Sequence, residues 1–384
     1  MKLFTAGLAT LCALLSVVHA SPTHQFDHFF PGWNQDIQDI LRDNCSEPYA
    51  SYLADKIKPG RGVLSLVNDV IDCVLGEFPE SRKANLATGA LVLGLIPTIL
   101  QSIGSSTVET ALVGSRRPLL GFLISLGSPA VSMMKINEFA RAVADFVEGS
   151  DPSDIGIEGL RNSSAPAIWA ILIALFEYIV VGGAVANVLH LAYTLGYNAV
   201  ALFAPNTIYG VPVWTFGAAA IHLFGRLALW ARVRIQHVDA RSYNAHIIKP
   251  LDTWMPSWFL PAVFQPSMRF ELRKTRRSAV WFYSLTWVIS IGTLAQVAFG
   301  TLVLSGLLFF SLTDCLFIVL RYTISAILCR AVLRLELAGM AAARDAAREK
   351  AKDHDAAETE QFVPSEQKSD ADFHTSPLRS RTAP

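Results

Sequence analysis

The sequence contains few charged residues and carries no net charge. Of its 384 residues only 17% are Asp, Glu, Lys or Arg, whereas a soluble domain usually has about 25%. The 32 basic residues balance the 32 acidic ones, so the chain lacks the basic surplus with which proteins bind nucleic acid. Hydrophobic residues make up 52% of the chain. The composition argues against an ordinary soluble enzyme and against nucleic acid as a partner, and it predicts a membrane protein.

Common motifs of catalysis and metal binding are absent as well. The sequence has no GxxxxGK(S/T) phosphate loop, no GxSxG nucleophile elbow, no HExxH zinc motif, no CxxC pair and no DDxxD cluster. His19, His24 and His28 near the N-terminus lack the companion ligands of a metal site. We therefore expect no metal and no cofactor, and no motif assigns a reaction.

Residues 1–20 have the pattern of a secretory signal peptide. Lys2 precedes an apolar stretch over 3–18, and Ala20 supplies the small residue that signal peptidase requires. The alternative is an uncleaved signal anchor. Either arrangement places residue 21 onward on the lumenal or outer side of a membrane.

Residues 21–85 are polar enough to form a small helical ectodomain. Of the five cysteines in the chain, Cys45 and Cys73 lie in this oxidising compartment, so we predict a disulfide between them. Two independent buried thiols are the alternative. Asn44 and Asn162 begin N-glycosylation sequons, a short pattern that also arises by chance.

Several stretches are apolar enough to cross a bilayer, which takes about 20 residues of helix. Five qualify, and two further stretches, 118–134 and 187–204, are marginal because they are short or interrupted by Gly and Pro. The five are 86–103, 166–190, 211–230, 279–301 and 304–328.

The distribution of positive charge decides between span counts. The loop 232–278 carries nine Lys or Arg and three acidic residues, so it belongs in the cytosol by the positive-inside rule. Six spans would place it outside, whereas five or seven place it and the C-terminal tail inside. We favour five full spans with one or two partial ones, because 166–204 leaves almost no turn between two crossings.

Ionisable residues inside the spans are the candidate functional residues of the sequence. They usually face the bundle interior and pair, because burial of a charge in lipid is costly. One hypothesis is a polar pathway in which Glu177 pairs with His222 or Arg226, and Asp314 pairs with Arg321 or a neighbour. The alternative is that these residues are structural pairs between helices.

Two segments beyond the spans have distinctive compositions. The aromatic, proline-broken stretch 254–261 suits the headgroup layer, where Trp is favoured, or else folds back on the bundle. Residues 331–384 are predicted to form a cytosolic part, with a solvated helix over 340–352 and a disordered polar tail after it.

Four short motifs are distinctive as a set: ESRKAN at 80–85, GLIPT at 94–98, SRRPLL at 115–120 and LGSP at 126–129. Together they resemble a group of uncharacterised integral membrane proteins of filamentous ascomycete fungi. Cys45 and Cys73 also fit that group, and the resemblance covers roughly residues 40–330. It implies a fungal source and a signal-bearing multispan protein, and it carries over no activity and no functional residue.

Together these features predict an all-α, polytopic membrane bundle with a disulfide-closed ectodomain and a cytosolic tail. We expect it in the plasma membrane or endomembrane system, in contact with the lipid bilayer and with other membrane proteins or a small-molecule ligand. The expected role is a non-enzymatic accessory, sensor or scaffold, with a possible association with fungal secondary metabolism. The alternatives are a small-molecule transporter and a membrane-embedded enzyme acting on a lipid or isoprenoid-like substrate.

Glycan mapping at Asn162 separates the five-span from the seven-span order. Five spans place residues 135–164 in the cytosol, so we expect no glycan at Asn162 and no mobility shift when a glycosidase is applied to an Asn44→Gln variant. A glycan on Asn162 would exclude the five-span order.

Overall fold

The computed structural model describes residues 26–57, 63–133, 136–148, 166–202, 208–237, 257–265, 268–273 and 275–361. The predicted signal peptide, Asn162 and the tail beyond Gln361 lie outside these ranges. The described chain is an all-α bundle with two short antiparallel strand pairs.

Among the described residues five helices are long and apolar enough to span a membrane, the same number as the full spans predicted from the sequence. They expose many large apolar side chains, among them Leu91, Trp287 and Phe317 at 71%, 59% and 62% exposure. Such an apolar surface suits contact with lipid rather than with water. The helices are α5 (Glu80–Ile103), α10 (Pro166–Tyr197), α11 (Gly210–Arg232), α13 (Arg276–Ser305) and α14 (Leu312–Gln361).

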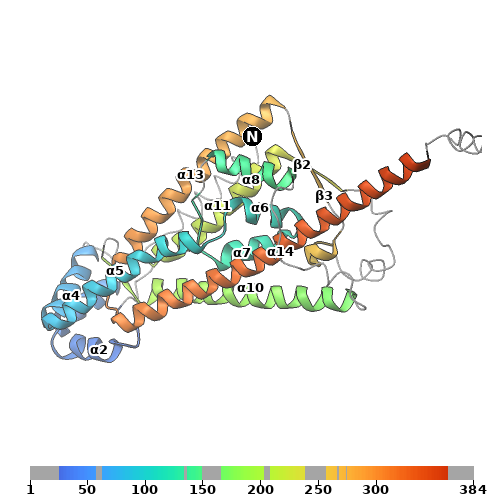
Figure 1. Ribbon diagram of the computed structural model, residues 1–384. Helices are drawn as coiled ribbons and strands as arrows, with labels where there is room; N and C mark the ends of the chain where they lie inside the picture. The colour runs from blue at the N-terminus through green and yellow to red at the C-terminus, as the bar shows by residue number, and fades with distance from the viewer. Residues whose placement is uncertain are drawn as a thin grey trace, which may run out of the picture.

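The bundle has two distinct ends (Figure 1). At one end lies a cap of three helices, α2 (Asn34–Asp43), α3 (Ser46–Ile57) and α4 (Val63–Glu77). At the other end strands β2 (Val233–His237) and β3 (Met268–Leu272) pair in an antiparallel ribbon. We call these the cap end and the ribbon end.

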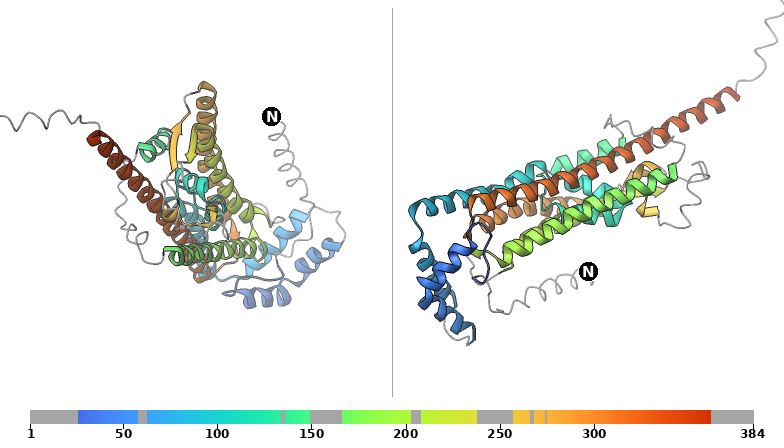
Figure 2. Two further views of the ribbon diagram at one scale, coloured as in Figure 1. Left: turned by 90° about the vertical axis from the view of Figure 1, so that its right-hand side faces the viewer. Right: turned by 90° about the horizontal axis from the view of Figure 1, so that it is seen from below.

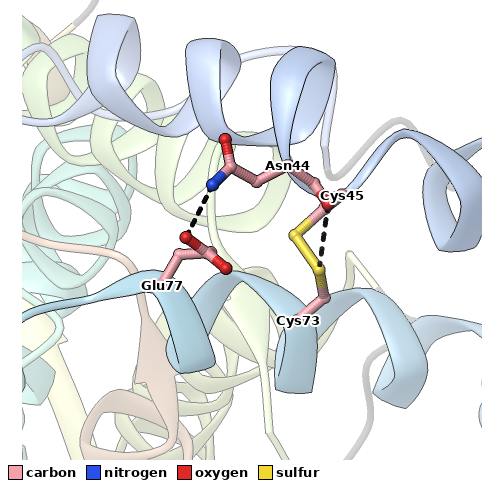
Figure 3. Close-up of a disulfide and its surroundings, with 4 residues drawn as sticks. All are labelled: Asn44, Cys45, Cys73 and Glu77. Atoms are coloured by element: carbon pink, nitrogen blue, oxygen red, sulfur yellow. Dashed lines mark hydrogen bonds between the residues drawn. A yellow bond between two sulfur atoms is a disulfide. The ribbon is translucent and has the colours of Figure 1, made fainter.

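The disulfide Cys45–Cys73 joins the start of α3 to α4, as predicted (Figure 3). Next to it the side chain of Asn44 donates a hydrogen bond of 2.6 Å to Glu77 at the end of α4. The core of the cap is aromatic and aliphatic, with Phe26, Ile37 and Val74 fully buried. The disulfide therefore closes a cap that has its own apolar core.

The cap packs directly on the loops of the bundle. Strands β1 (Val200–Ala201) and β4 (Leu307–Leu308) pair beneath it. Phe309 follows β4 with a φ of 68°, a left-handed conformation that is rare for a bulky residue. The centre of its ring lies 5.6 Å from that of Phe29 and 6.2 Å from that of Phe78, and both pairs have edge-to-face geometry. The strained residue thus fixes the cap to the membrane helices.

Three shorter helices lie inside or beside the bundle: α6 (Thr107–Arg116), α7 (Pro118–Gly127) and α8 (Ile136–Glu148). Helix α7 has 10 residues and extends about 15 Å, half of the hydrocarbon thickness. The helix in the marginal stretch 118–134 is therefore too short for a full crossing. The second marginal stretch, 187–204, is mainly the last three turns of α10 and makes no separate crossing.

Helix α14 runs without a break from the cap end past the ribbon end (Figures 1 and 2). It begins at Leu312, later than the predicted boundary at residue 304, because the β4 strand and Phe309 occupy the preceding residues. Met340 and Ala343 are 3% and 2% exposed. The helix predicted over 340–352 exists, but its first turn is packed in the bundle and not solvated.

Removal of the disulfide should loosen the cap without disrupting the spans. The bridge closes a sequence separation of 28 residues, for which we expect a loss of about 3 kcal/mol in the cap's stability on Cys45→Ser/Cys73→Ser substitution. Limited proteolysis of the protein in detergent should cut the cap of this variant faster, as in wild type treated with reductant. Equal cleavage rates would contradict a stabilising role.

Candidate functional site

The most conspicuous polar site is a buried charge cluster that forms where α6 ends. Arg117 precedes Pro118, and a residue before proline is kept out of the helical conformation. The helix therefore stops at Arg116, and α7 restarts at Pro118 with Arg117 between them at φ −120° and ψ 77°. Gly121 lets the two helices approach closely, since a Cβ at this position would lie 2.7 Å from the Cα of Gly114.

Arg117 is fully buried and binds two carboxylates on different spans. Its Nη1 forms ion pairs with Glu177 of α10 and with Glu336 of α14, the latter at 2.8 Å. Its Nη2 donates to the backbone oxygen of Phe259 at 3.0 Å. The guanidinium also lies 5.3 Å from the ring centre of Tyr178. One side chain thus ties α10, α14 and the segment around Phe259 to the α6–α7 break.

A second arginine completes the cluster. Arg116 is 5% exposed, and its Nη1 lies 3.5 Å from the oxygen of Ala262. The backbone N–H of the same Ala262 donates to Glu336 at 3.2 Å. Two arginines and two glutamates therefore meet in a small volume, and their formal charges sum to zero. We call Arg116, Arg117, Glu177 and Glu336 the charge cluster.

The electrostatics of the cluster keep Arg117 cationic. A guanidinium stays protonated in proteins, and the carboxylates of Glu336 and Glu177 compensate its charge. Breaking a buried pair leaves an uncompensated charge, which costs far more than the loss of an exposed ion pair. The cluster is therefore a strong constraint on how the helices pack.

The segment that contains Phe259 comes from the aromatic stretch 254–261. Short helical turns η2 (Ser257–Phe259) and η3 (Ala262–Phe264) place Phe259 on Tyr178, with ring centres 4.7 Å apart and stacked. Leu260 and Val263 are 3% and 5% exposed. The described part of this stretch thus folds back on the bundle, which was the alternative to a place in the headgroup layer.

His222 lies in a separate buried site and uses both ring nitrogens. Nδ1 is 2.8 Å from the hydroxyl of Thr110, and Nε2 is 3.2 Å from the oxygen of Ala130. Since a carbonyl oxygen only accepts, Nε2 carries the proton and Nδ1 accepts from Thr110. Arg226 shares a cavity of about 30 Å³ with His222, room for about one water molecule.

Asp314 lies far from both sites, at the start of α14. Its carboxylate accepts from the Ser311 hydroxyl at 2.7 Å and from the Gly32 backbone N–H of the cap at 3.2 Å. It is separated from Glu336 by six helical turns, roughly 33 Å. Asp314 therefore caps a helix and holds the cap domain.

The predicted partner of Glu177 was wrong, and of the two alternatives for Asp314, Arg321 or a neighbour, the structure shows the neighbour Ser311. Glu177 pairs with Arg117 instead of His222 or Arg226, and Arg321 donates to Asn187 at 2.8 Å instead of pairing with Asp314. Helical spacing predicts only which residues share a helix face, as His222 and Arg226 do around their cavity. Which helix faces which depends on tertiary packing that the spacing does not contain.

Sequence reasoning missed Arg117 and Glu336 as members of the site. Arg116 and Arg117 entered only as part of the SRRPLL motif, and Glu336 lay beyond the predicted end of the last span. The available signal was an isolated acid in the apolar stretch 331–343 and an arginine pair enclosed by apolar residues.

The arrangement favours structural over chemical roles for these groups. The functional groups that were candidates for a polar pathway are divided among three places, and Glu177, His222 and Asp314 each have partners within the protein. Among the described residues no group of three or more His, Cys, Asp or Glu could hold a metal ion. Comparison with family models, curated proteins and solved structures finds no match to the chain.

Loss of the central guanidinium should destabilise the whole bundle. Arg117→Leu leaves Glu177 and Glu336 buried without their shared cation, and we expect a loss of about 3–5 kcal/mol. The measurement is unfolding of the purified protein in a mild detergent.

Arg334→Leu is the matched control. Arg334 is 56% exposed and pairs with Glu109 at 3.2 Å, so its removal should cost less than about 1 kcal/mol. Similar losses for the two variants would show that the buried cluster has no special role.

Proposed function

We propose that this chain is a non-enzymatic membrane scaffold or sensor in which one helix joins the cap end to the ribbon end. The observation that carries the proposal is the continuity of α14. Asp314 attaches its first turn to the cap, Glu336 fixes its middle to the charge cluster, and the helix then extends to Gln361. A stiff helix of this kind holds the two ends in a fixed relation across the bilayer.

The use of the intramembrane polar groups also supports this proposal. Glu177, His222 and Asp314 are the groups that a proton-coupled transporter or an acid–base enzyme would employ. Each one is engaged with protein partners that stabilise the fold, and the cavity beside His222 has room for about one water. We therefore propose that these three residues stabilise the packing of the helices.

The proposed orientation has the cap outside or in the lumen and the end of α14 in the cytosol. The positive-inside rule supports it, because residues 232–278, which include the end of α11 and the start of α13 at the ribbon end, hold nine of the 32 basic residues. A signal peptide, a glycan on Asn44 and a fungal source belong to the same proposal. The plasma membrane and the endomembrane system are its two proposed locations.

Complementation of a deletion strain tests the proposal in the native host. We expect the isosteric variants Glu177→Gln and Asp314→Asn, together with His222→Gln, to restore the metabolite profile and growth of the wild type. They keep hydrogen bonding and remove ionisation. A chain that ends after Arg344 should fail to complement, because it lacks the part of α14 that projects from the bundle.

The opposite result would favour the other functions. Loss of one metabolite from the deletion strain, with rescue by the truncated chain and not by Glu177→Gln, would indicate an exporter or an enzyme. Tagged protein levels and localisation serve as the control for each variant, since a misfolded chain would fail for a trivial reason.

A further inference from the structure

A groove lies at the ribbon end between two spans, outside the sites described above. The last turns of α11 and the first turns of α13 form its walls, and its volume is about 480 Å³. This size lies within the range of small-molecule sites, about 300–1,000 Å³. Its walls consist mainly of Leu227, Trp230, Trp281 and Leu285, with Arg273 and Arg277 at the rim.

The groove lies where two candidate spans meet the membrane boundary. Helix α11 ends at Arg232 and α13 begins at Arg276, so both helices change from apolar to basic at this level. Trp230 and Trp281 are 69% and 55% exposed. Exposed tryptophans at a span's end are typical of the membrane–water interface. The groove therefore opens toward lipid at the depth of the headgroups.

Arg273 is held in place by the ribbon. Its backbone N–H donates to the oxygen of Arg232 at 2.8 Å, and its own oxygen accepts from the Arg232 side chain at 3.0 Å. Its guanidinium lies 5.7 Å from the ring centre of Trp230. The pairing of β2 with β3 joins these two helix ends. One rim cation is thus ordered against the apolar wall before any ligand binds.

The charges at the rim are not balanced locally. None of the described residues that line the groove is acidic. The first turn of α13 contains Arg276 and Arg277 and no acidic residue, which opposes the helix dipole. An anion between Arg273 and Arg277 would relieve this repulsion, and guanidinium groups bind phosphate oxygens with paired, charge-assisted hydrogen bonds.

We propose that this groove binds one anionic phospholipid of the surrounding leaflet. The phosphate lies between Arg273 and Arg277, and an acyl chain follows the wall formed by Leu227, Trp230 and Trp281. A free phosphate would use only the rim and leave the apolar walls uncovered, which is why a lipid fits better than a soluble anion. Basic pockets between spans are known to suit anionic headgroups. This site is independent of the proposed scaffold or sensor role.

Native mass spectrometry of the full-length protein in a neutral maltoside detergent tests the site. The probes are phosphatidylglycerol and phosphatidylcholine with the same acyl chains. We expect phosphatidylglycerol to bind preferentially, and Arg273→Gln/Arg277→Gln to weaken its binding by about 10-fold or more. Phosphatidylcholine has the same phosphate but a choline cation that neutralises the headgroup, so its binding should be weaker and should change less.

Arg276→Gln is the matched control, because Arg276 has the same charge in the same helical turn and does not line the groove. Arg277→Gln alone leaves the contact of Arg273 with Trp230 intact, so it tests the site even if the double variant fails to fold. We expect a clear loss for Arg277→Gln and almost none for Arg276→Gln.

Three results would overturn the proposal. The first is equal binding of the two lipids by the wild type. The second is an equal effect of Arg276→Gln and Arg277→Gln. The third is displacement of phosphatidylglycerol by inorganic phosphate or glycerol phosphate at comparable concentration, which would identify a site for soluble anions.

Discussion

A buried arginine sets the main constraint on this bundle. Arg117 is enclosed in an apolar interior, where an isolated cation would be very costly. It reaches Glu177 on α10, Glu336 on α14 and the backbone of Phe259. These partners are 60, 219 and 142 residues away in the sequence. The need to pair one charge therefore fixes the mutual position of segments that local interactions would leave free.

The same constraint explains why the bundle contains a broken helix. In a continuous helix residue 117 would not lie at a turn of the backbone, and its side chain would not be directed from that turn into the bundle. Pro118 forces the break, and Gly121 allows α6 and α7 to pack closely around it. The break thus places Arg117 among the spanning helices. Its backbone groups remain paired, as a place among these helices requires: the N–H of Arg117 donates to Val113 at 2.8 Å and its oxygen accepts from Gly121 at 2.9 Å.

The number of spans and the disulfide were predictable because each depends on local sequence. Apolar length determines whether a helix can cross, and the five predicted spans match the five long helices. Cys45 and Cys73 were the cysteine pair in the polar region. The partners of Glu177 and Asp314 on other elements were not predictable, because they depend on which helix faces are in contact. The residue Glu336 was missed for a related reason: the last helix continues well past residue 328, where apolar composition alone ended the span.

Three structural features follow one another along α14. Asp314 and Phe309 fix the cap, the charge cluster fixes the centre, and the helix projects beyond the ribbon end (Figure 2). The groove with Arg273 and Arg277 lies at the ribbon end, on α11 and α13. A protein that couples two faces of a membrane needs a rigid connection and a defined depth in the bilayer, and these features supply both.

A double-mutant cycle between Arg117 and Glu336 tests the central claim most directly. The free energy of unfolding in detergent is measured for Arg117→Met, for Glu336→Met and for the double variant. If the buried pair organises the bundle, the double variant will be more stable than Arg117→Met alone, with a coupling energy of about 2 kcal/mol or more. Additive losses, with no coupling between the two positions, would contradict the account.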